Sequence, residues 1–177
     1  LVASLPVLEV TVDPLSPARV TAATQIPVNL GQGQCDVSLQ LEPVGGQHLL
    51  RGGGGAIAYR LVTRDGMESE RLSGDGFVQV PVRILIDQTQ MLPPGPYEGE
   101  VEVRLVSPSG EIVGDTATLR VAAQVIPRAQ VNLAGAHASG AAYSSLDLGS
   151  LESGERSRLL LQVRSNTQVH IEVSSLN

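Results

Sequence analysis

Hydrophobic and polar residues alternate with a period of two along most of this chain. In Leu8–Val12 every second residue is apolar, and 97–105 repeats the pattern over a longer stretch. Shorter alternations occupy positions 26–28, 37–41, 57–61, 78–84 and 117–121. Strands with one apolar and one more polar face are typical of antiparallel sheets that pack on one side. The pattern therefore predicts at least seven such strands.

Turn-forming residues separate the alternating segments. Examples are Asp13-Pro14, Gly45-Gly46, Asp65-Gly66 and Pro93-Pro94-Gly95-Pro96. No segment has convincing helical periodicity. Many short strands with frequent turns predict an all-β fold, an antiparallel sandwich of the immunoglobulin type. Pro81 cannot donate a ladder hydrogen bond, so we expect its strand to be an edge or to carry a bulge.

The composition defines the kind of core that the sandwich can have. The chain has 177 residues, 42% of them hydrophobic, with one Phe, three Tyr and no Trp. We therefore expect a core of Val, Leu, Ile and Ala. No apolar run approaches the ~18 residues of a membrane-spanning helix. Cys35 is the single cysteine, which excludes an intrachain disulfide and a multi-cysteine metal site.

Charge and motif content argue against nucleic-acid binding and catalysis. The net charge is −6, and all twelve cationic residues are scattered arginines. The three histidines, His48, His137 and His170, are not at metal-ligand spacing. The glycine run Gly52–Gly55 lacks the Lys-Ser/Thr that a phosphate-binding loop needs. We expect a non-enzymatic protein with no catalytic residues, no cofactor and no metal site.

One face of the segment 97–105 carries a row of carboxylates, Glu98, Glu100 and Glu102. Calcium sites collect oxygen ligands from loops around the ion, whereas a flat row points its groups in parallel. We interpret the row as a solvated, self-repelling face that discourages edge aggregation.

Three blocks of the sequence recur in the same order near the C-terminal end. They pair Val10–Ser16 with Leu146–Glu152, Ile26–Val28 with Leu161–Val163, and Val37–Leu41 with Val169–Val173. The first copy continues through four more strands, whereas the second stops at Asn177. We predict a complete sandwich at residues 1–124 and the first strands of a second, related sandwich at 125–177. Either the chain is a fragment, or something else completes those strands.

Several short motifs resemble those of a known family. They are Gly55–Leu61 with Asp65-Gly66, Val80–Ile84 with Pro94–Val103, Leu146–Gly149, and Val163–Asn166. The chain resembles spore coat protein U-like domains and the related chaperone–usher pilin domains of bacterial fimbriae. It departs from them in two respects: Cys35 has no disulfide partner, and a further strand-like run, Ala117–Val125, follows the expected final strand.

The resemblance implies a mechanism of assembly. Pilin domains are incomplete immunoglobulin-like sandwiches that an extended segment of a neighbour completes by β-strand addition. It implies a structural or adhesive subunit of a surface fibre (fimbria or pilus), secreted to the cell surface via the periplasm. Its partners would be neighbouring subunits, a periplasmic chaperone and an outer-membrane usher. Leu8, Val10 and Val12 form the candidate donor strand; the alternative is an ordinary first strand of the same domain.

A second function remains open at this stage. The two copies could be tandem binding or spacer modules of a larger secreted or cell-surface protein, without polymerisation. Neither the ligand nor the position within a fibre follows from the sequence.

Overall fold

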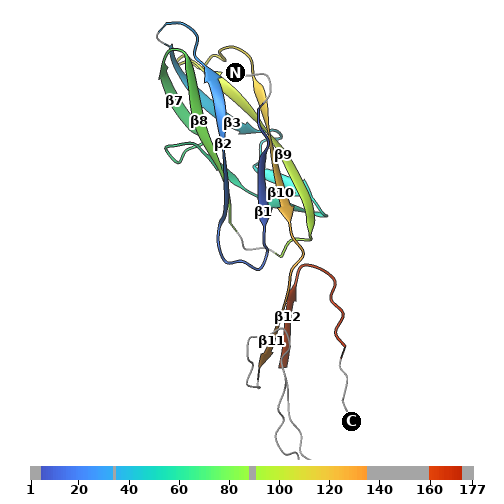
Figure 1. Ribbon diagram of the computed structural model, residues 1–177. Coiled ribbons are helices and arrows are strands. Elements are labelled where there is room, and N and C mark those ends of the chain that lie inside the picture. Colours follow the sequence, from blue (N-terminus) through green and yellow to red (C-terminus); the bar gives the residue numbers. More distant parts are fainter. Residues whose placement is uncertain (1–4, 34, 88–90, 135–159, 173–177) are drawn as a thin grey trace, which may run out of the picture.

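The computed structural model describes residues 5–33, 35–87, 91–134 and 160–172. These residues form twelve strands and no helix. Figure 1 shows two parts, a β-sandwich that contains β1 to β10 and a two-stranded hairpin, β11–β12, that projects from one end of it. The expected all-β, immunoglobulin-like sandwich is confirmed.

The larger sheet contains seven strands. Its main path is, in spatial order, β1 (Leu8–Val12), β10 (Ala117–Val125), β9 (Gly95–Val106), β3 (Cys35–Pro43) and β7 (Ser69–Gly74). Neighbours run antiparallel except β1 and β10, which are parallel. The short hairpin of β4 (Leu49–Gly52) and β5 (Gly55–Ala58) joins this sheet beside β9, where Arg51 pairs with Glu98.

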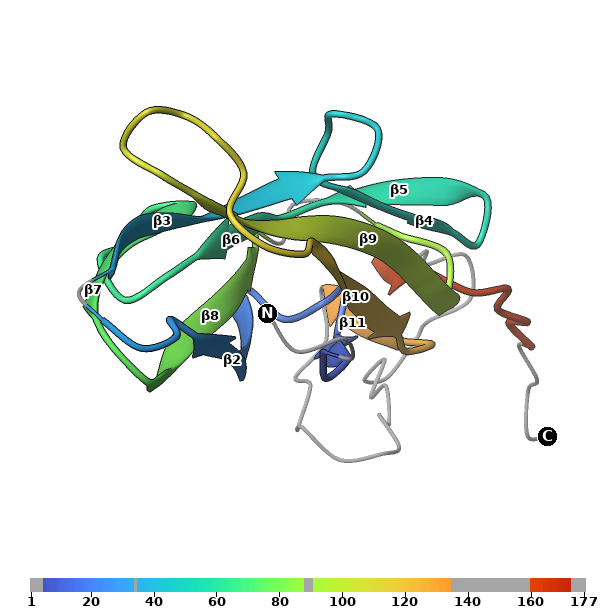
Figure 2. The ribbon, with the colours of Figure 1, turned by 90° about the horizontal axis from the view of Figure 1, so that it is seen from above.

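The smaller sheet has three strands and covers the inner face of the larger one. Its order is β2 (Val20–Asn29), β8 (Phe77–Ile86) and β6 (Arg60–Val62). Seen from above, β2 and β8 lie on one side of the sandwich and β3 and β9 on the other (Figure 2).

The core lies between these sheets and is built from the alternating apolar residues. Leu39, Val82, Val103 and Leu119 are completely buried, and they come from four different strands. Burial of such aliphatic side chains is the main favourable term in folding. As the composition predicts, the core is almost entirely aliphatic.

Tyr97 is the largest fully buried side chain of this core. It lies near the start of β9, and its hydroxyl donates a hydrogen bond to the carbonyl of Pro93, four residues upstream, at 3.0 Å. A tyrosine that bonds back across this corner is a hallmark of immunoglobulin-like sandwiches.

The segment 57–61, expected as one strand, is divided between the two sheets. Ile57 belongs to β5 in the larger sheet and Leu61 to β6 in the smaller, and the chain crosses over at Tyr59. All three side chains remain buried. The period-two pattern persists because the chain stays extended while its hydrogen-bonding partners change.

The strand of Pro81 was expected to be an edge or to carry a bulge, and this expectation holds only in the immediate surroundings of Pro81. β8 is the central strand of its sheet, and its register with β2 runs without a bulge from Val20↔Ile86 to Asn29↔Phe77. However, β6 pairs only with residues 83–85 of β8. At Pro81 the backbone therefore has a partner strand on one side only.

The hairpin that projects from the sandwich follows β10 closely. β11 (Ala129–Ala134) and β12 (Leu160–Ser165) pair antiparallel, with Val131 opposite Val163. Of the second repeat copy, Leu161–Val163 lies in a strand, whereas residues 169–172 lie in none. The block Leu146–Glu152 lies outside the described residues. The division at 124/125 stays a prediction; β10 itself ends at Val125.

Candidate functional site

The candidate donor strand lies within the chain's own sandwich. Leu8, Val10 and Val12 are 2%, 8% and 1% exposed, and they contribute to the core. β1 pairs in parallel with β10, from Leu8↔Val121 to Val12↔Val125. Within one molecule, β1 is thus the first strand of the same domain. A donor role would require its exchange with a second copy, and it stays a prediction.

The further strand expected after the final strand of the pilin pattern closes the larger sheet. β10 pairs with β9 along its whole length, from Ala117↔Val103 to Val125↔Gly95. The position beside β9 is therefore filled by the chain's own β10, and β1 follows it. The sandwich needs no foreign strand at this flank.

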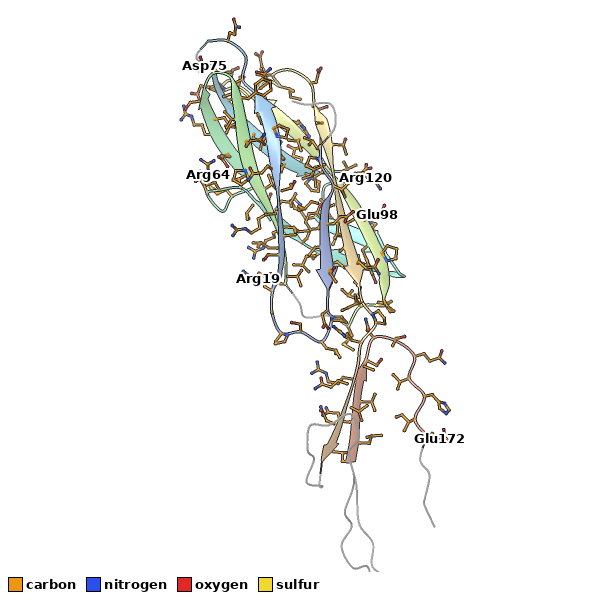
Figure 3. The ribbon with its side chains drawn as sticks, viewed as in Figure 1. Arg19, Arg64, Asp75, Glu98, Arg120 and Glu172 are labelled. Atoms are coloured by element: carbon orange, nitrogen blue, oxygen red, sulfur yellow. The ribbon has the colours of Figure 1, made fainter. Side chains whose placement is uncertain are left out.

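Two of the three carboxylates in the β9 row, those of Glu98 and Glu102, lie beside arginines, and the role of the row as a solvated face stays a prediction. The Arg120 Nη2 atom lies 3.4 Å from Oε2 of Glu98, and these side chains lie together on β10 and β9 (Figure 3). The Arg104 Nη2 atom lies 3.2 Å from Oε2 of Glu102 and also contacts Glu42 of β3. Sequence reasoning missed this pairing because two of the partners, Arg120 and Glu42, lie on neighbouring strands.

The outer edge of the larger sheet is charged. On β7, the Arg71 guanidinium donates two hydrogen bonds to Asp36 of β3, with Nε–Oδ1 at 2.9 Å and Nη2–Oδ2 at 2.5 Å. The hydrogen bonds from Arg71 lower the pKa of the Asp36 carboxyl. Charged side chains on an edge strand discourage pairing with another sheet.

An apolar hollow of about 300 Å³ opens at the hairpin end of the sandwich. Its lining includes Val12, Ile57, Tyr59 and Leu92. At its rim, the Asp87 carboxylate accepts a hydrogen bond from Arg19 Nε at 2.7 Å and lies 3.6 Å from Arg60. The rim carboxylate is therefore already neutralised, so the hollow offers an apolar surface without a free charged group.

The structure describes two of the three histidines, His48 and His170. His48 Nε2 lies 3.3 Å from Glu68 Oε1, and its ring packs edge-on against Tyr59 with centroids 5.1 Å apart. His170 is exposed, and His137 lies outside the described residues. Within residues 5–33, 35–87, 91–134 and 160–172, no three His, Cys, Asp or Glu side chains are grouped to hold a metal ion. The same ranges contain no helix suited to crossing a membrane.

The hairpin β11–β12 presents an uncovered apolar surface. Val131, Leu161 and Val163 share one face, which we call the hairpin face. Val131 and Leu161 are 54% and 37% exposed, unlike the apolar residues of the sandwich core. Val163 is half-buried, but no described strand forms a second layer over this face, and an isolated two-stranded hairpin is marginally stable in water. The hairpin face is therefore the candidate interaction site.

No protein-family model and no curated protein sequence matches the chain. Among solved structures, it is similar to the Escherichia coli chaperone DraB, at 13% identity and a TM-score of 0.37, covering 67% of this chain and 53% of DraB. It is similar to CfaE, the adhesive subunit of CFA/I fimbria of enterotoxigenic E. coli, at 9% identity and a TM-score of 0.38, covering 67% and 48%. A family 123 glycoside hydrolase from Clostridium perfringens matches at 12% identity and a TM-score of 0.38, covering 69% and 23%.

The chain thus spans about half the length of DraB and of CfaE. Similarities this distant do not indicate a function.

Proposed function

We propose that the chain is a non-enzymatic structural or adhesive subunit of a bacterial surface fibre, assembled by β-strand complementation. The observation that carries the proposal is the hairpin face. Val131 is 54% exposed and Leu161 37% exposed on a strand pair that has no second layer among the described residues. A hairpin in this state needs a further strand or sheet to bury its apolar residues.

β1 is the strand that we propose to be exchanged between copies; in the other copy it would pair with β10, while a further strand or sheet would cover the hairpin face. β1 carries three apolar residues on one face, Leu8, Val10 and Val12, and lies at the edge of its sheet. Exchange of β1 between copies would replace one set of β1–β10 hydrogen bonds with an equal set between molecules. An apolar strand exchanged in this way is a β-augmentation.

The cellular route follows from this mechanism. Subunits with an uncovered apolar face associate non-specifically unless the face is held until assembly. We therefore propose a periplasmic chaperone and an outer-membrane usher as partners, with the assembled fibre at the cell surface.

One observation favours a second function. The sandwich is completed by its own β1 and β10, so it does not depend on a foreign strand for closure. Such a self-contained module also suits a tandem binding or spacer role in a larger secreted or cell-surface protein.

Immunogold electron microscopy of producing cells distinguishes the two functions. The antibody is raised against residues 1–124. Label along thin surface fibres is the expected result, and label at fibre tips alone would assign an adhesive position. Label spread over the envelope without fibres would overturn the fibre proposal and favour the spacer module.

A further inference from the structure

The projecting hairpin is joined to the sandwich by a short linker and by a small group of polar contacts. Residues 126–128 connect β10 to β11. At the first of them, the backbone N–H of Ile126 donates to the carbonyl of Val12 at 3.0 Å, which extends the β1–β10 ladder by one bond. This bond ties the start of the linker to the edge of the larger sheet.

Asn166, directly after β12, makes contacts in three directions. Its Nδ2 group donates to the carbonyl of Ile126 at 2.9 Å and to the carbonyl of Leu92 at 3.0 Å. Its Oδ1 atom accepts the backbone N–H of Arg128 at 2.7 Å. A single side-chain amide therefore ties the end of β12 to the linker and to the loop that precedes β9, with both donors and its acceptor in use.

The backbone around Asn166 reinforces the same joint. The Asn166 N–H donates to the carbonyl of Arg128 at 3.2 Å, and the Ser165 hydroxyl donates to that carbonyl at 3.0 Å. The Arg128 Nε atom donates in turn to Asp13 Oδ2, at 2.9 Å, on the turn after β1. The backbone N–H of Leu15 donates a hydrogen bond to the Asp13 carboxyl and is the largest cause of its lowered pKa. The Arg128 guanidinium lowers the same pKa further.

We infer that Asn166 is the residue that locks the hairpin to the sandwich, so that the two parts of the chain move as one rigid body. The Asp13–Arg128 ion pair is a minor contributor, because solvent screens an ion pair at the surface. The Asn166 amide is half-buried and joins three backbone segments, and no other side chain among the described residues does this. This lock fixes the direction in which the hairpin face points, whatever partner covers it.

The test is the isosteric substitution Asn166→Asp in the full chain. The carboxylate keeps the oxygen that accepts the Arg128 N–H. In place of the two amide N–H donors it puts a second oxygen that faces the carbonyls of Leu92 and Ile126. The matched control is Asn132→Asp, which introduces the same charge at an exposed asparagine of β11.

Spin labels report the geometry. In a Cys35→Ser background, labels are attached through Thr118→Cys on β10 and Gln130→Cys on β11, both exposed positions. Pulsed electron–electron double resonance gives the distribution of distances between the two labels. We expect one narrow distribution for the parent and for Asn132→Asp, and its loss in favour of a broad distribution for Asn166→Asp.

Two outcomes would overturn the inference. The first is an equally narrow distribution in Asn166→Asp, which would show that the linker and the other contacts of the joint fix the hairpin without the Asn166 amide. The second is a loss of amide-exchange protection in the β11–β12 ladder of Asn166→Asp, because Asn166 would then support folding of the hairpin rather than its attachment. Retained amide-exchange protection of the β11–β12 ladder, together with a broad distance distribution between the spin labels, supports the inference that Asn166 attaches the hairpin.

Discussion

At the scale of the residue, Tyr97 and two glycines determine the packing at one end of the larger sheet. Gly53 and Gly54 have φ angles of +52° and +81°, as a two-residue hairpin turn between β4 and β5 requires. A Cβ atom at Gly53 would lie 2.8 Å from the Tyr97 hydroxyl, and one at Gly52 would lie 2.1 Å from the carbonyl oxygen of Pro96. The glycine run is thus an ordered turn that fits against Tyr97.

The substitution Gly52→Ala tests this packing. The added methyl cannot be accommodated without moving the backbone of β9, so we expect a loss of about 1–3 kcal/mol in the free energy of unfolding. Urea titration measures it. Gly55→Ala is the matched control, because its Cβ would be 3.8 Å from the Tyr97 hydroxyl, an ordinary contact. Equal stability of the two variants would show that β4 is not held against β9 as described.

At the scale of the element, β1 has the two properties that strand exchange between copies requires. Its apolar side chains belong to the core, and among the described strands it pairs only with β10, so that a single ladder holds its backbone. Strand exchange between copies needs this combination, because the apolar side chains supply affinity and the single ladder limits what must be broken.

Cross-linking tests whether β1 exchanges. Glu9 and Ala122 are register partners on the outer face of the sheet. Chains with Glu9→Cys and chains with Ala122→Cys, both in a Cys35→Ser background, are refolded together and treated with a short bis-maleimide. We expect covalent heterodimers, measured by mass spectrometry.

The control replaces Ala122→Cys by Thr118→Cys, which lies about 13 Å further along β10 at ~3.3 Å per residue. A double variant of one chain that carries both Glu9→Cys and Ala122→Cys reports pairing within the molecule. Cross-links in that double variant but not in the mixture would show that β1 stays in its own sandwich and would contradict the donor role.

At the scale of the whole molecule, the charge composition determines which side chains affect the stability of the sandwich in alkaline solution. All twelve cationic residues are arginines, so no lysine loses its charge in alkaline solution. Burial, and to a lesser extent Glu68, raises the pKa of the Tyr59 phenol to about 12, and burial also raises the pKa of Tyr97. The alkaline stability of the sandwich therefore depends mainly on its buried tyrosines.

The sign of the effect follows from the direction of these pKa shifts. Below the ordinary tyrosine pKa of about 10, both states hold the phenolic proton; above it, the unfolded chain releases the proton and the folded chain does not. We expect the urea midpoint to fall as the pH rises from about 10 towards 12, and to fall less steeply in Tyr59→Phe. Identical slopes for the parent and the variant would contradict the assignment to Tyr59.

Much of the sandwich could be predicted from the sequence. The residues at alternate positions of 8–12, 37–41 and 117–121 are buried as expected, because side chains of a strand point to opposite faces whatever its neighbours are. The same pattern could not show that the strand through Tyr59 changes sheets, since extended backbone looks alike in both. Nor could it show that Arg120 lies beside Glu98, because this contact depends on the register of β10 against β9.

The sequence by itself determined the all-β class, the aliphatic core and the absence of an intrachain disulfide, because these depend on local periodicity and on composition. Only the tertiary structure decided that β1 and β10 close the sandwich and that Asn166 reaches the carbonyls of Leu92 and Ile126. The physical reason is that pairing and attachment depend on contacts between segments far apart in the chain. Such contacts produce no periodic pattern of hydrophobic and polar residues in the sequence.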